Sequence, residues 1–175
     1  MANILILYST TDGHTLEICQ YLKQVIENNG NRVSLKSVDE GSDFDMGAFD
    51  KLVIGASIRY GKHAKQVYDV IKKNQKILDS KPNAFFSVNV VARKPEKNTP
   101  ETNPYLKKFL KQIDWQPQQL AVFAGKLNYP IYSYWDKQII RFIMWMTKGP
   151  TDPETVVDYT DWKQVESFAQ RVCDL

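Results

Sequence analysis

Residues 7–15, LYSTTDGHT, combine the residue types of an anion-binding turn. The segment follows the apolar run NILILYS and leads directly into the helical pattern TLEICQYLKQVIENNG. It holds one glycine, no lysine and the hydroxyl-bearing residues Ser9, Thr10, Thr11 and Thr15. The first N–H groups of a helix lack intrahelical partners and lie at the positive end of its dipole, so such a turn can bind a phosphate group.

The kind of phosphate follows from what the turn lacks. A Walker loop needs GxxxxGK[ST] and a Rossmann fingerprint needs three spaced glycines, and neither pattern occurs in this segment. Triphosphate hydrolysis is therefore disfavoured, and the turn suits a monoester phosphate held by hydroxyls and backbone amides. The turn alone leaves an alternative open, namely a capped strand-to-helix junction without a ligand.

Two further loops carry candidate binding residues. The first, GASIRYGKHAK (residues 55–65), begins with the small residues Gly55, Ala56 and Ser57, which would let a planar ring approach the backbone, and Gly61 permits a positive φ. Its expected rim residues are Arg59 and Tyr60. The second, SVNVVARKPEKNTPETNPY (residues 87–105), is stiffened by prolines and is basic through Arg93, Lys94 and Lys97. Each charge run by itself is also typical of a solvated face, but together the three loops fit a flavin mononucleotide (FMN) cradle ringed by positive charge.

Strand-like and helix-like segments, which must position these loops, alternate along the chain. The expected strands are residues 3–9, 32–38, 51–57, 84–91 and 120–125. The expected helices are one that follows the first turn and is closed by Gly30, then residues 64–78, about 105–113, and 162–173 with Thr160 as its N-cap.

This alternation predicts a flavodoxin-like α/β fold, a doubly wound five-stranded parallel sheet with strand order 2-1-3-4-5. In such a sheet the ligand binds at the carboxyl ends of strands 1 and 3, where the winding reverses. The first two candidate loops begin there. We expect one domain over residues 1–175, with an insertion at the fifth strand.

The insertion covers about residues 128–153 and is far longer than an ordinary connection of roughly 2–6 residues. The following VVDY (156–159) is interpreted as a second half of the fifth strand. On a helix over residues 133–147, one side would carry Trp135, Ile139, Phe142, Ile143 and Met146, and the opposite side Lys137, Arg141 and Lys148. Such a helix could lie in a membrane interface or hold an apolar macrocycle, or its apolar side could pack as core.

Composition narrows the function classes. With 43% hydrophobic and 25% charged residues in 175, the chain is expected to form one globular core. A formal net charge of +3 is too small to indicate a nucleic-acid partner, and we expect neither a secretory signal nor a membrane span. Cys19 and Cys173 are interpreted as reduced core thiols, which indicates the cytoplasm, and two histidines without a Cys/His cluster indicate no metal site.

Over essentially its whole length the chain resembles the flavodoxin-like, quinone-dependent protoporphyrinogen IX dehydrogenases. The most specific segments are IGASIRYG, SVNVVARKPEKNTP and the aromatic insertion ending in VVDYTDW. The resemblance implies FMN as cofactor, protoporphyrinogen IX as substrate, a membrane quinone as electron acceptor and a role in haem biosynthesis. From the apolar and basic sides of the insertion we also expect peripheral attachment to the cytoplasmic membrane, whereas the preferred quinone and any self-association stay open.

Site residues follow from the resemblance. Residues 11–15 are expected to bind the phosphate, with His14 contributing only its backbone. Residues 57–61 and 87–91 are expected to face the flavin ring from its two sides. The full set of expected flavin-binding residues is Ser9, Thr10, Thr11, Asp12, Gly13, His14, Thr15, Ala56, Ser57, Ile58, Arg59, Tyr60, Gly61, Ser87, Val88, Asn89, Val90 and Val91. The expected substrate-binding residues are Arg59, Arg93, Lys94, Lys97, Trp135 and Arg141. No residue is assigned as a general base.

The function this implies is the six-electron dehydrogenation of protoporphyrinogen IX to protoporphyrin IX. The alternative is a flavodoxin-type electron carrier, which a pI near 8.7 and the basic rim disfavour because such carriers tend to show an acidic face. A second alternative is a non-catalytic module that uses the fold to bind a partner.

Overall fold

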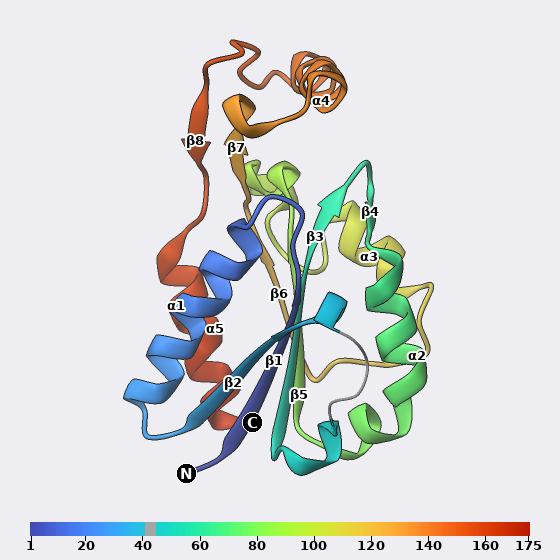
Figure 1. Cartoon of the computed structure of the whole chain (residues 1–175), viewed down its shortest axis with the longest axis vertical. Coiled ribbons are helices and arrows are strands. Elements are labelled where there is room, and N and C mark those ends of the chain that lie inside the picture. The colour runs from blue at the N-terminus through green and yellow to red at the C-terminus, as the bar shows by residue number, and fades with distance from the viewer. Residues whose placement is uncertain (41–44) are drawn as a thin grey trace.

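A sheet of five parallel strands forms the centre of the computed structural model, which describes residues 1–40 and 45–175 (Figure 1). The strands are β1 (Asn3–Ser9), β2 (Arg32–Ser37), β3 (Lys51–Arg59), β5 (Asn83–Val88) and β6 (Gln119–Phe123). Their order is β2-β1-β3-β5-β6, and the short β4 (Lys62–His63) pairs antiparallel with the end of β3. The predicted order 2-1-3-4-5 is therefore confirmed, since β4 only shifts the numbering.

Helices cover both faces of this sheet. α1 (His14–Asn28) and α5 (Trp162–Asp174) lie on one face, and α2 (Lys65–Ser80) and α3 (Pro104–Leu110) on the other (Figure 1). The short 3₁₀ segments are η1 (Val38–Glu40), η2 (Met46–Ala48), η3 (Val90–Arg93), η4 (Pro95–Lys97) and η5 (Tyr129–Ile131).

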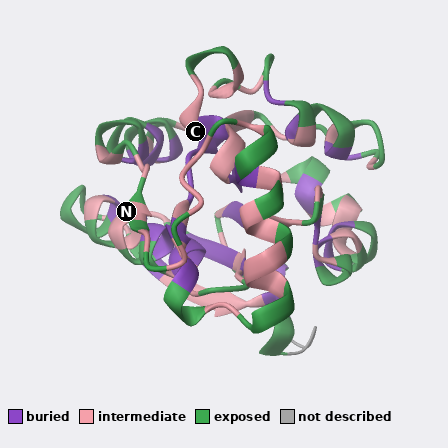
Figure 2. Ribbon diagram, turned by 90° about the horizontal axis from the view of Figure 1, so that it is seen from above, coloured by how far each residue is buried: buried purple, intermediate pink, exposed green. Residues whose placement is uncertain are grey.

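Alternate residues of β1 pack into two separate hydrophobic cores, one on each face of the sheet. Ile4 and Ile6 join the cluster that includes α1 and α5, and Leu5 and Leu7 join the cluster with α2 and α3. All four are fully buried, and Figure 2 shows the buried positions gathered in the central strands and on the inner faces of the helices. A strand covered on both faces must be apolar at every position, which is why NILILYS is a continuous apolar run rather than an alternating one.

Gly55 has a packing role that its place in the sequence did not reveal. A Cβ atom at this position would lie 2.0 Å from Cζ of Phe86 on the neighbouring strand β5. The glycine therefore makes room for a fully buried aromatic ring of the core. The expectation that it admits a ligand ring to the backbone is wrong.

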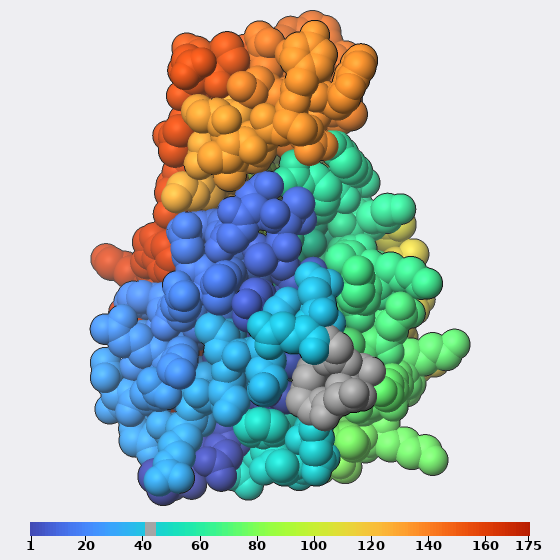
Figure 3. Space-filling model, viewed as in Figure 1, coloured from blue at the N-terminus to red at the C-terminus, as the bar shows by residue number. Residues whose placement is uncertain are grey.

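The insertion leaves the sheet as a two-stranded ribbon. β7 (Lys126–Asn128) continues the chain beyond β6, and β8 (Val156–Asp158) pairs with it antiparallel. Between them lie η5 and α4 (Tyr134–Met146), and Figure 3 shows this part standing as a head at one end of the body. The interpretation of residues 156–159 as a second half of the fifth strand is therefore wrong, because the returning chain pairs with β7 outside the parallel sheet.

The last helix begins one residue later than its predicted cap implied. The side chain of Asp161 accepts hydrogen bonds from the N–H groups of Lys163 and Gln164, which makes Asp161 the N-cap of α5. Thr160 instead donates its hydroxyl to the carbonyl of Ala124 at 3.0 Å. The predicted N-cap at Thr160 is wrong, because that hydroxyl is used to join the end of β8 to the end of β6.

Candidate functional site

A cleft lies at the carboxyl ends of β1, β3 and β5, beneath the insertion. It holds about 880 Å³ of empty space, part of it open to solvent. It is lined from all three predicted loops and from the insertion. Its position is the switch point of the doubly wound sheet, where the topology favours a ligand site.

Most of the predicted flavin-binding residues meet in this cleft. Those that line it are Thr10, Thr11, Asp12, His14, Thr15, Ser57, Ile58, Arg59, Tyr60, Gly61, Val88, Asn89, Val90 and Val91. Four others are outside the lining: Ser9, Ala56 and Ser87, which are buried in the strand ends, and Gly13. Gly13 shapes the turn instead, with a φ of +89° at the start of α1.

The first turn of α1 has an unused hydrogen-bonding group. The hydroxyl of Thr15 is buried and has no partner in the protein. No side chain caps the helix N-terminus, and Thr10 Oγ1 accepts from the N–H of Gly13 at 3.0 Å. Leaving a buried hydroxyl unpaired costs about 1–3 kcal/mol. A phosphate oxygen in the cleft would pair with it and with the free N–H groups, so this turn fits a phosphate group.

A tight turn forms one wall of the cleft. Tyr60 and Gly61 have φ values of +52° and +79° and join the paired residues Arg59 and Lys62. Two positive φ values in a two-residue loop are typical of a type I′ hairpin. The turn holds the half-exposed Tyr60 ring at the rim of the cleft, where the sequence placed it.

The opposite wall is held by a pair of buried amides. Asn89 and Asn103 bond through Asn103 Nδ2 to Asn89 Oδ1 at 3.0 Å. Asn89 Oδ1 also accepts from the N–H of Ala92, and Asn103 Oδ1 caps α3 by accepting from the N–H of Tyr105 at 3.2 Å. The pair therefore orients the 88–91 segment and places Tyr105, which lines the cleft.

The insertion covers the cleft as a roof, but with other residues than those that the sequence pattern placed at the substrate. Residues of the lining that were missed are Tyr105, Gly125, Lys126, Leu127, Tyr132, Ile140, Ile143 and Met144. Met144 is buried with Leu127 and Tyr129 in a small separate cluster. The signal was available in the helical spacing of Ile140 and Met144, which lie on the side opposite the more conspicuous aromatic stripe.

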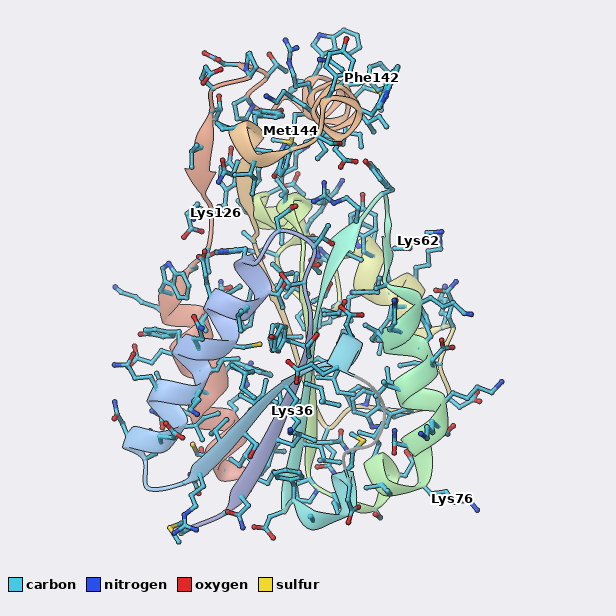
Figure 4. The ribbon with its side chains drawn as sticks, in the orientation of Figure 1. Lys36, Lys62, Lys76, Lys126, Phe142 and Met144 are labelled. Atoms are coloured by element: carbon cyan, nitrogen blue, oxygen red, sulfur yellow. The ribbon has the colours of Figure 1, made fainter. Side chains whose placement is uncertain are left out.

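α4 turns its most apolar side away from the protein. Figure 4 shows Phe142 on the outer side of the helix and Met144 on the side toward the body. The exposed residues of the helix are Tyr134, Trp135, Ile139, Phe142, Trp145 and Met146, with Trp135 at 75%. Ile143, expected with this stripe, lines the cleft instead. A helix that packs only as core would bury its apolar stripe, so the core interpretation fits the inner side of α4 alone.

Of the expected substrate-binding residues, Arg59 is the one that lines the cleft. Arg93 donates from Nη2 to the carbonyl and to Oγ1 of Thr147, each at 3.1 Å, and from Nη1 to the carbonyl of Val90. It thereby joins the C-terminal end of α4 to the cleft wall, where a cation also complements the helix dipole. The others outside the lining are Lys94, Lys97, Trp135 and Arg141.

His63 is a buried group near the cleft wall whose charge would oppose folding. Its Nε2 lies 2.9 Å from Ser87 Oγ, its Nδ1 has no partner, and the ring packs 4.6 Å from that of Phe109. Burial lowers the pKa of His63 to about 4. The imidazole is therefore neutral at pH 7 in the folded state.

This lowered pKa makes stability depend on pH. In the unfolded chain the pKa of histidine is about 6.5, so between pH 6.5 and 4 the unfolded chain binds a proton at His63 while the folded protein does not. The free energy of unfolding therefore falls as the pH decreases from 6.5 toward 4. Between pH 7 and 5.5 we expect His63 to contribute a loss of about 1 kcal/mol. Urea unfolding at both pH values, with His63→Gln as the non-titrating control, measures it. Equal pH dependence in the two proteins would exclude His63 as the source.

Two further features bear on alternatives to a flavin site. Within residues 1–40 and 45–175, no three His, Cys, Asp or Glu side chains gather in a way that could hold a metal ion. In the same residues, no helix is long and apolar enough to cross a bilayer.

Comparison with known proteins shows to which family the chain is similar. The flavodoxin domain model matches residues 5–154. Protoporphyrinogen IX dehydrogenase (quinone) of Escherichia coli (strain K12) is 45% identical over 171 residues, 98% of this chain and 94% of that protein. The protein of the same name from Leishmania major is 43% identical over 166 residues, 94% of this chain and 72% of that one. A flavodoxin from the domain Archaea superposes with a TM-score of 0.54 at 11% identity over 98% of this chain and 96% of that chain, a likeness of fold alone.

Proposed function

The chain belongs to the flavodoxin domain family, among its quinone-dependent protoporphyrinogen IX dehydrogenases, and we propose that the cleft under the insertion is the active site, with FMN as cofactor. The reaction is the six-electron oxidation of protoporphyrinogen IX to protoporphyrin IX, with a quinone as electron acceptor, in haem biosynthesis. A flavodoxin domain implies a flavin. The observation that carries the choice of FMN is the unpaired, buried Thr15 hydroxyl at the uncapped start of α1.

The residues of the chain bind, orient and exclude water. Residues 11–15 would hold the phosphate, and residues 57–61 and 88–91 would face the ring from the two walls of the cleft. FMN, when bound, supplies two-electron redox chemistry, so three rounds account for the six electrons. The apolar roof of Ile140 and Met144 suits an apolar macrocycle or a quinone ring and keeps water from the reacting face.

A membrane surface is part of this proposal. Large apolar side chains gathered on an exposed face mark an interaction site, and tryptophans such as Trp135 and Trp145 favour the bilayer interface. Placing the outer side of α4 in that interface would attach the protein peripherally, on the cytoplasmic side. It would also bring the roof of the cleft close to the pool of lipid-soluble quinone.

Anaerobic spectroscopy of the holoprotein tests the proposed function. Purified protein is expected to be yellow, to bleach at the oxidised flavin bands when protoporphyrinogen IX is added, and to regain colour with a quinone. A yellow protein that the porphyrinogen does not bleach would support a flavodoxin-type carrier. A protein that binds no flavin would contradict the proposal as a whole.

A further inference from the structure

Arg59 spans the mouth of the cleft and contacts three separate segments. Its guanidinium pairs with the carboxylate of Asp12 in the phosphate-binding turn. It also lies over the ring of Tyr132 in the insertion, 5.3 Å from the centroid, and 5.9 Å from that of Tyr60 on its own hairpin. All four residues line the cleft. The guanidinium is therefore held at the entrance by stacking as well as by charge.

Asp12, the partner of this guanidinium, carries its negative charge in a partly buried position that disfavours it. Asp12 is two-thirds buried at its side chain. Burial raises the pKa of the Asp12 carboxyl, Arg59 offsets that rise in part, and the charge of Asp136 adds to it. Asp12 also sits in the turn that would receive a phosphate dianion, so bound FMN would add further repulsion.

The substrate brings carboxylates of its own. Protoporphyrinogen IX carries two propionate side chains on an otherwise apolar macrocycle. An arginine whose plane is fixed by stacking can bind such a group through two parallel hydrogen bonds. Because one carboxylate would replace another, the exchange would leave the charge on the guanidinium balanced, and Tyr60 and Tyr132 would keep it in place.

We propose that Arg59 recognises a propionate of the porphyrinogen and that Asp12 is the resident carboxylate which the substrate displaces. This inference rests on the proposed function and adds the recognition group and its competitor. Before the substrate binds, Asp12 keeps the guanidinium of Arg59 at the cleft entrance. Asp12 also opposes binding, because it occupies the guanidinium that the propionate would pair with.

Steady-state kinetics of the holoenzyme with two substrates test the exchange. Protoporphyrinogen IX is compared with its dimethyl ester, which lacks the carboxylate charges. With FMN saturating in every assay, we expect Arg59→Gln to raise KM for the free acid roughly 10-fold or more and to leave KM for the ester unchanged. Asp12→Asn is expected to lower KM for the free acid roughly 2–5-fold.

Lys62 offers a matched control. It is an exposed cation on β4, paired in register with Arg59 and outside the cleft lining (Figure 4). Lys62→Gln is expected to change neither substrate's KM. An equal effect of Arg59→Gln on acid and ester, measured with FMN saturating, would overturn the inference, and so would a rise in KM in Asp12→Asn. Wild-type enzyme that turns over neither substrate would contradict the proposed function itself. Normal turnover by the wild type, with a KM for the free acid that Arg59→Gln does not change, would contradict this inference alone.

Discussion

Replacing residues 129–155 by an Asn-Gly turn is expected to leave a folded, FMN-binding protein whose turnover with a long-tailed quinone falls roughly 100-fold. Asn128 and Val156 are paired at the end of the β7–β8 ribbon, so a two-residue turn can close it. None of the replaced residues belongs to the two main cores or to the partly buried side chains packed against them, and the small cluster under α4 is separate. The variant would lose the roof of the cleft and the exposed side of α4 together.

The measurements are circular dichroism, FMN titration, vesicle co-sedimentation at low and high salt, and turnover with long-tailed and water-soluble quinones. A second variant, Trp135→Gln with Phe142→Gln, keeps the roof and changes only the outer side of α4. We expect it to lose vesicle binding while turning over the water-soluble quinone normally. If the shortened protein does not fold, the insertion is core after all. If it binds vesicles and uses the long-tailed quinone at full rate, the insertion has neither role.

Changing Gly13 and Thr15 together to valine is expected to weaken FMN binding roughly 10²–10³-fold. Thr15→Val removes a hydroxyl that would bond a charged phosphate, worth about 1.5–3 kcal/mol. Gly13 has a φ of +89°, and no atom lies within 4 Å of the place where a Cβ would stand, so valine there costs conformational energy of about 1–2 kcal/mol rather than a clash. The unliganded turn can relax to relieve that strain, and FMN would have to restore it.

Fluorescence titration of FMN into apoprotein measures the effect, and Thr15→Ser, which keeps the hydroxyl, is the control. The single variant Thr15→Val carries a distinct signature. Its apoprotein should be as stable as the wild type or more stable, because a buried unpaired hydroxyl is removed. Tight FMN binding by the double variant would show that this turn serves another purpose.

Local patterns in the sequence were sufficient to predict the strand order of the sheet and the position of the cleft. The continuous apolar runs of β1 and β3 and the helices between strands predict strand order, since strands buried on both faces and crossover connections leave few topologies. The turn before α1 was recognisable because a helix N-terminus and its hydroxyls are neighbours in sequence. Gly61 was recognisable for the same reason, since its conformation depends on the residue itself.

The remaining features depend on contacts between distant parts of the chain. Arg93 was expected at the substrate because it is basic and follows a strand, but its partner is Thr147, on the far side of the insertion. The pairing of Arg59 with Asp12, the space that Gly55 leaves for Phe86, and the cleft-facing side of α4 were equally hidden. Residue type and spacing determine which side of an element is apolar or charged. What that side touches is decided only when the chain packs, because the free energy of each contact depends on which other surfaces are already buried against it.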